Sequence, residues 1–140
     1  PSGSGATHAG LLTGLRLSGQ SAPVHGICVR RDHQRQQTRV KTVLHKLASL
    51  LDIDPKLTSD AVLTWDGALA PGYGKMSPGT EHALSLMART EGVFLDPVYT
   101  AKTFAGLLDL IESGHIPTSK KVVMLHTGGL PALFGYQEEF

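Results

Sequence analysis

A glycine-rich turn near the start of the sequence, Gly3-Ser4-Gly5-Ala6-Thr7, has the residue types of a phosphate site. Glycines let backbone N–H groups approach an anion closely, and the N-terminus of a following helix adds a partial positive charge. The hydroxyls of Ser4 and Thr7 can donate further hydrogen bonds to phosphate oxygens. The turn has neither the Lys-Ser/Thr pair of a P-loop nor the GxGxxG spacing of a dinucleotide-binding turn. An ordinary glycine-rich turn is the alternative.

A second turn, Thr127-Gly128-Gly129, directly follows the apolar run at residues 122–125. A hydroxyl at the carboxyl end of a strand, followed by two glycines, can meet the edge of a planar ligand. The alternative is an ordinary connection between a strand and a helix.

Two phenols stand in loops beside proline and glycine, Tyr73 and Tyr99. A phenol can donate a hydrogen bond to a carboxylate, or act as an acid or base if a cation lowers its pKa. Packing of each ring beneath its loop is the alternative. Lys102 follows Tyr99 by three residues and could share its helix face, although a solvated charge is the simpler interpretation. The seven histidines are each interpreted as structural, and we expect no metal site.

The composition excludes several classes of protein. The net charge is +1, from 13 basic and 12 acidic residues, which gives no electrostatic reason to expect nucleic acid or a membrane as a partner. Cys28 is the single cysteine, so no intrachain disulfide can form, and its apolar neighbours predict a buried structural thiol. No apolar run approaches the roughly 20 residues of a membrane span. We therefore expect a cytoplasmic protein.

Apolar spacing predicts alternating helices and strands. Thr7, Asp32 and Ser77 are the predicted helix caps, and the polar stretch at residues 35–39 and the Arg30-Arg31 pair are expected to be solvated. The predicted helices cover residues 9–17, 33–51, 78–92, the segment after Asp96-Pro97 up to Gly114, and 130–136; the predicted strands cover residues 24–29, 61–65 and 121–126.

This alternation predicts an α/β fold, a parallel sheet with helices on both faces. Ligands of such sheets bind at the carboxyl ends of the strands, where both glycine turns should lie. The opening turn has no predicted strand before it, although phosphate-binding turns normally connect a strand to a helix. We therefore expect the sequence to begin within a fold.

Four segments together resemble one branch of the pyridoxal 5'-phosphate (PLP) dependent enzymes, the D-cysteine desulfhydrases and 1-aminocyclopropane-1-carboxylate (ACC) deaminases. In chain order, the segments are GSGATHAG at residues 3–10, YG at 73–74, EGVFLDPVYTAK at 91–102, and HTGGLPAL at 126–133. Their order and separation match over the whole chain. The resemblance implies a tryptophan synthase β-like PLP fold.

The resemblance also implies roles for individual residues. The PLP phosphate is held by Ser4, Gly5, Ala6 and Thr7, and the pyridine nitrogen faces Thr127. Tyr73 and Tyr99 border the substrate and are the candidate catalytic residues.

Thr100 and Thr127 are the candidate specificity residues, because ACC deaminases resemble the chain but carry glutamate and leucine there. A glutamate near the pyridine nitrogen would keep it protonated and deepen the electron sink for ring opening, whereas a neutral threonine suffices where a β-thiol leaves. These two positions favour the desulfhydrase.

The family's Schiff-base lysine belongs to a preceding segment, and none of the seven lysines matches its context. The resemblance thus implies that residues 1–140 are the C-terminal part of the large PLP-binding domain and cover less than half of a typical member. The implied partners are the missing N-terminal half of the same protein, a small amino-acid substrate and a second subunit in a homodimer.

The leading hypothesis is that the full-length protein converts D-cysteine to pyruvate, ammonia and hydrogen sulfide by PLP-dependent β-elimination. The alternatives are an ACC deaminase, a lyase for another β-substituted amino acid such as cysteate, or an inactive fragment that binds only phosphate or a partner chain. A nucleotide-binding domain is disfavoured, because no acidic residue follows the glycine turn at the distance needed to bind a ribose.

Overall fold

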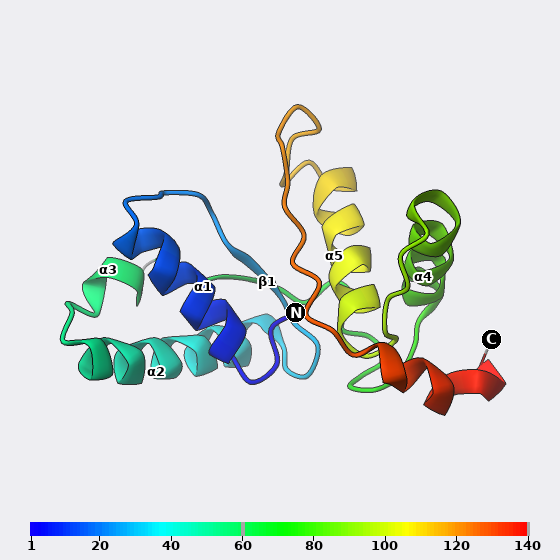
Figure 1. Ribbon diagram of the computed structural model, residues 1–140, viewed down its shortest axis with the longest axis horizontal. Helices are drawn as coiled ribbons and strands as arrows, with labels where there is room; N and C mark the ends of the chain where they lie inside the picture. Colours follow the sequence, from blue (N-terminus) through cyan, green and yellow to red (C-terminus); the bar gives the residue numbers. More distant parts are fainter. Residues whose placement is uncertain (60, 140) are drawn as a thin grey trace.

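The computed structural model describes residues 1–59 and 61–139, in which helices alternate with short strands (Figure 1). None of the described helices is both long and apolar enough to cross a membrane. The elements are α1 (Ala6–Leu17), β1 (His25–Ile27), α2 (His33–Leu51), α3 (Lys56–Ser59), β2 (Leu63–Trp65), α4 (Pro78–Glu91), α5 (Thr100–Glu112) and a terminal 3₁₀ helix, η1 (Leu130–Glu139).

The sheet is small and parallel. β1 pairs with β2 in the register His25↔Leu63 to Ile27↔Trp65. On the other side of β1, Ser2 forms a parallel bridge with Cys28, and its N–H donates to the carbonyl oxygen of Ile27 at 2.7 Å. The opening glycine turn therefore does connect a strand-like pairing to a helix, which is the geometry that phosphate-binding turns use.

Helices cover both faces of the sheet, as predicted. Gly26 faces α1, where an added Cβ would collide with the imidazole of His8. The next residue, Ile27, faces α5, and a Cβ added to Gly106 would lie 2.7 Å from the Ile27 Cγ2 atom. Successive strand residues point to opposite faces, so α1 and α5 lie on opposite sides of β1 (Figure 1).

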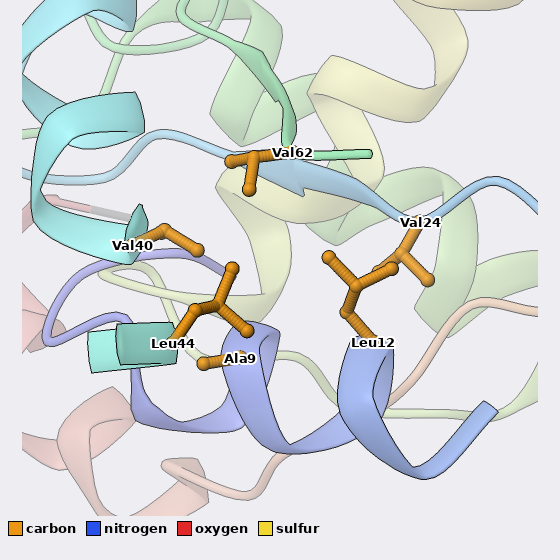
Figure 2. Packing of buried hydrophobic residues seen from close by; sticks show 6 residues of the cluster. All are labelled: Ala9, Leu12, Val24, Val40, Leu44 and Val62. Atoms are coloured by element: carbon orange, nitrogen blue, oxygen red, sulfur yellow. The ribbon is translucent and has the colours of Figure 1, made fainter. Parts of the chain in front are cut away.

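The described residues form two apolar cores. The first core lies between α1, α2 and the sheet and contains Ala9, Leu12, Val24, Val40, Leu44 and Val62 (Figure 2). The second lies between α4 and α5 around Leu84, Leu95 and Ala101. The fold is thus the α/β arrangement that the sequence predicts.

The predicted helix caps are confirmed at two positions and wrong at a third. The Asp32 side chain accepts a hydrogen bond from the Arg35 N–H at 2.8 Å, and Ser77 accepts one from the Thr80 N–H at 3.2 Å. α1 begins three residues earlier than predicted, after Gly5 in the left-handed conformation (φ 88°), without a side-chain cap. Thr7 therefore lies in the first helical turn and does not cap it.

The predicted strand at residues 121–126 is wrong. The structure assigns no strand there, and Val123 is 93% exposed. An apolar run becomes a strand only when it pairs with another backbone, and the pairings of the described sheet join β1 to β2 and to Ser2 without these residues. Only Met124 of this run packs into the second core.

Side chains of α2 occupy the outer edge of β2. The carbonyl oxygen of Val62 accepts a hydrogen bond from Gln37 Nε2 at 3.1 Å, and that of Thr64 lies 3.0 Å from His33 Nδ1. His33 and Gln37 are four residues apart on one helix face, so α2 closes this edge against further strands.

Candidate active site

The predicted phosphate turn lies at the start of α1 with most of its backbone donors unpaired. Among the described residues, no acceptor is recorded for the N–H groups of Ser4, Gly5 or Thr7, while the Ala6 N–H donates to Ser4 Oγ at 3.3 Å. The first N–H groups of a helix have no partner inside the helix. Gly5 is buried and the other three residues are exposed. This set of donors fits a phosphate group.

The first two carbonyl oxygens of the same turn accept hydrogen bonds from side chains on its other side. Gly3 O accepts from Arg31 Nη1 at 2.9 Å and from Gln36 Nε2 at 3.2 Å, and Ser4 O accepts from Arg39 Nε at 2.9 Å. Gln36 has no exposed surface, and Arg31 is partly buried. The prediction that these residues are solvated is wrong for both, because their polar groups satisfy a buried backbone.

A series of hydrogen bonds between buried side chains continues from Gln36 beneath the turn. Gln36 Nε2 also donates to Ser2 Oγ at 2.9 Å, and that oxygen lies 3.3 Å from His8 Nδ1. Burial lowers the pKa of His8 to about 4, so the imidazole is neutral at physiological pH. His8 thus packs as a structural residue, as predicted.

Tyr73 and Tyr99, predicted from separate loops, meet in the structure. Their hydroxyl oxygens lie 2.5 Å apart, and both rings are partly exposed. The hydrogen bond with Tyr73 is the largest cause that raises the pKa of Tyr99, followed by burial. The guanidinium of Arg30 lies 5.7 Å from the centre of the Tyr73 ring and acts in the opposite direction, but it is outweighed. Tyr99 is therefore a proton donor at neutral pH.

Lys102 anchors the loop that carries Tyr73. Its side chain is fully buried, and Nζ donates to the carbonyl oxygens of Leu69 at 2.9 Å and Gly72 at 2.7 Å. Burial lowers the pKa of this ammonium group. The interpretation of Lys102 as a solvated charge is wrong, and its position one turn after Tyr99 couples the two tyrosine loops.

Asp96 organises the turn before α5. Its buried carboxylate accepts hydrogen bonds from the N–H groups of Val98 (3.0 Å), Tyr99 (2.8 Å) and Thr100 (2.8 Å), and from Thr100 Oγ1 (2.7 Å). Thr100 Oγ1 accepts in return from the Asp96 N–H at 2.7 Å. The Thr100 hydroxyl is thus directed at Asp96, and its role in substrate specificity stays a prediction.

The second glycine turn rests on this Asp96 turn. Thr127 is exposed, and Gly128 and Gly129 both have the positive φ angles that favour glycine, 88° and 97°. A Cβ added to Gly129 would lie 2.7 Å from the carboxyl carbon of Asp96. Only glycine allows this approach.

His126 fixes the backbone beside Thr127. Its Nδ1 accepts a hydrogen bond from the Gly128 N–H at 3.2 Å, so the ring proton of the neutral imidazole lies on Nε2. Nε2 then donates to the carbonyl oxygen of Phe94 at 3.1 Å. His126 is thus engaged on both ring nitrogens, as expected for a structural residue.

Consecutive arginines after β1 connect the predicted site residues. Arg30 lies over Tyr73, and Arg31 binds the carbonyl oxygen of Gly3, so the tyrosine pair and the phosphate turn flank the same strand end. In Figure 1 the N-terminus lies beside the segment that leads into η1. Within the described residues, no hydrogen bond joins Thr127 to the phosphate turn.

The predictions from sequence missed four residues of this region, Arg31, Gln36, Arg39 and Asp96. Asp96 carried a signal, because an aspartate before a proline at a helix start commonly binds the backbone N–H groups that follow. The other three carried none, since their partners are backbone carbonyls more than 25 residues away.

The sequence comparisons agree with this geometry. Residues 1–128 match the family described as "Pyridoxal-phosphate dependent enzyme". A D-cysteine desulfhydrase of Yersinia pestis (strain Pestoides F) is 40% identical over 138 residues, which are 99% of this chain and 41% of that protein. A 1-aminocyclopropane-1-carboxylate deaminase of Bradyrhizobium sp. (strain BTAi1) is 34% identical over 132 residues, 94% of this chain and 39% of that protein.

A solved structure agrees as well. The crystal structure of an ACC deaminase homologue superposes with a TM-score of 0.86 at 31% identity, covering 98% of this chain and 40% of that one. The chain thus spans about two fifths of the length of the relatives that it matches.

Proposed function

Because the chain belongs to the family of pyridoxal-phosphate dependent enzymes, we propose that it forms part of an enzyme that eliminates hydrogen sulfide from D-cysteine. With one water, the reaction gives pyruvate and ammonia as the other products. In this proposal the chain provides the site for the cofactor phosphate and two phenols on the substrate side.

The phosphate turn supports the cofactor part of the proposal. The unpaired N–H groups around Gly5 and the exposed hydroxyls of Ser4 and Thr7 are suited to a phosphate dianion, and the Thr127 hydroxyl is the proposed partner of the ring nitrogen. When bound, PLP supplies an electron sink that weakens the bonds at the amino-acid Cα.

The 2.5 Å contact between the phenol oxygens of Tyr73 and Tyr99 is the observation that carries the proposal. Because the pKa of Tyr99 is raised, this phenol holds its proton at neutral pH. It can then donate a hydrogen bond to the substrate carboxylate or a proton to the departing sulfur.

Deamination of ACC is the second candidate, since a relative with that name is 34% identical. We favour D-cysteine because Thr100 and Thr127 are neutral and the desulfhydrase relative is 40% identical. Elimination from another β-substituted amino acid such as cysteate would use the same groups.

We also propose that the chain is the C-terminal part of the large PLP-binding domain. The Schiff-base lysine would then come from another part of the protein, and the complete enzyme would be a homodimer. The coverage of about two fifths of each relative supports the first of these points.

The test is the release of pyruvate from D-cysteine by the full-length protein, with ammonia release from ACC measured in parallel. Tyr99→Phe should lower kcat by roughly 100-fold, the effect expected for loss of a positioned proton donor. Thr42→Val removes an exposed hydroxyl on α2 and should leave kcat within about twofold.

Turnover of ACC without pyruvate from D-cysteine would favour the deaminase. Absence of both activities and of bound PLP would favour a phosphate- or partner-binding protein without catalysis.

A further inference from the structure

We propose that Arg31, Gln36 and Arg39 are positioning residues for the cofactor phosphate. They hold the carbonyl oxygens of the phosphate turn on the α2 side and thereby present its N–H groups to the opposite side. The inference rests on the proposed function, because it needs PLP as the bound anion.

The contacts connect the turn to α2 and to Arg31, which lies two residues before the helix begins. Two donors meet Gly3 O, from Arg31 at 2.9 Å and from Gln36 at 3.2 Å, and Arg39 Nε meets Ser4 O at 2.9 Å. Gln36 is itself held, because its Oε1 accepts from Arg31 Nη1 at 3.4 Å. We call Arg31, Gln36 and Arg39 the clamp. Because Gln36 is fully buried, the clamp is anchored in the interior of the molecule.

Because the peptide bond is planar, these contacts to the carbonyl oxygens also set the direction of the N–H groups of the turn. In a trans peptide the C=O and the following N–H point in opposite directions. The carbonyl of Gly3 shares its peptide plane with the N–H of Ser4, and the carbonyl of Ser4 shares its plane with the N–H of Gly5. Fixing both oxygens toward α2 turns both N–H groups away from it.

These same two N–H groups have no acceptor among the described residues. A free carbonyl oxygen in the turn would repel an anion, whereas here each oxygen is covered by a donor. The two guanidinium groups behind the peptides add positive potential at short range. The arrangement therefore prepares the turn for a phosphate before the phosphate binds.

Arg39 and Arg35 provide a matched pair for the test. Both are exposed on α2 one turn apart, and each substitution by alanine removes one positive charge. Arg39 binds the turn, while the guanidinium of Arg35 forms an ion pair with Asp32 at 3.4 Å and no recorded hydrogen bond to the turn in the described part of the chain. The comparison isolates the hydrogen bond to Ser4 O from the loss of charge.

The measurement is the affinity of the full-length protein for PLP, titrated by cofactor absorbance or fluorescence. Arg39→Ala should weaken PLP binding about 5- to 10-fold relative to Arg35→Ala, the loss expected for one hydrogen bond from a charged donor at an exposed site. Arg39→Lys should recover most of the affinity. Pyridoxal, which lacks the phosphate, should bind both alanine variants equally.

Equal PLP affinity in the two alanine variants would overturn the clamp. So would an equal loss of pyridoxal affinity in Arg39→Ala, because the effect would then not act through the phosphate. A wild-type protein that binds no PLP would refute the proposed function itself, and this outcome is visible before any variant is compared.

Discussion

The carboxylate of Asp96 is buried with four hydrogen bonds, three from backbone N–H groups and one from the Thr100 hydroxyl. These bonds set the backbone of Tyr99, and Gly129 packs on the same carboxyl group. A single acidic residue thus positions a candidate catalytic phenol and the second glycine turn.

Replacing Asp96 by asparagine should destabilise the protein, because an amide NH2 would face N–H donors that now meet a carboxylate oxygen. We expect the free energy of unfolding to fall by about 3 kcal/mol, measured by urea denaturation. Glu112→Gln makes the same chemical change at the exposed end of α5 and should cost no more than about 0.5 kcal/mol. Similar losses in the two variants would contradict the central role of Asp96.

At the scale of the elements, α5 packs closely on the sheet at one of its own glycines, Gly106. A Cβ at Gly106 would lie 2.7 Å from the Ile27 Cγ2 atom, and the β-branched Ile27 side chain has little freedom to move. The absence of a side chain at Gly106 therefore sets the distance between α5 and β1. Because Tyr99 directly precedes α5, the same distance sets the position of Tyr99 relative to the sheet.

Gly106→Ala should lower the free energy of unfolding by about 1–2 kcal/mol, because overpacking outweighs the better helix propensity of alanine. Gly14→Ala is the control, since nothing lies within 4 Å of a Cβ at Gly14 in α1. The control should gain up to about 1 kcal/mol. If both variants were stabilised equally in urea titrations, the close contact would not limit the packing.

The sequence predicted most of the helices, because the signals that mark a helix are local. Caps such as Asp32 and Ser77 are local, so a short pattern is enough to recognise them. The strand at residues 121–126 was wrong because a strand needs a partner from a distant part of the sequence, which no local pattern reports.

The exposed groups of the candidate site could be predicted from the sequence, but the buried residues that hold them in place could not. Tyr73 and Tyr99 could be named from their motifs and do meet. Gln36 and Lys102 could not be predicted to be buried, because a polar side chain enters a core only when distant backbone carbonyls need donors.

At the scale of the whole molecule, the neutral His8 links stability to pH. Its folded-state pKa of about 4 lies below the value of about 6.5 expected in the unfolded chain, so the unfolded chain takes up the proton more readily. The contribution to stability is complete above pH 6.5 and is lost as the pH falls from 6.5 toward 4.

The loss should reach about 3 kcal/mol over this interval, at about 1.4 kcal/mol per pH unit. Urea denaturation at pH 7, 6, 5 and 4.5 would measure it, and His8→Gln should flatten the dependence by that amount. His45→Gln removes an exposed histidine and should leave the curve unchanged. A wild-type curve that is flat between pH 6.5 and 4.5 would contradict the assignment.

The capping of β2 by His33 and Gln37 has a consequence for how molecules of this protein can associate. In the part of the chain that the structure describes, the carbonyl oxygens of Val62 and Thr64 that face away from β1 are both occupied. A strand of another molecule would need these oxygens as acceptors in order to pair with β2. α2 therefore closes this edge of the described sheet to strands of other molecules.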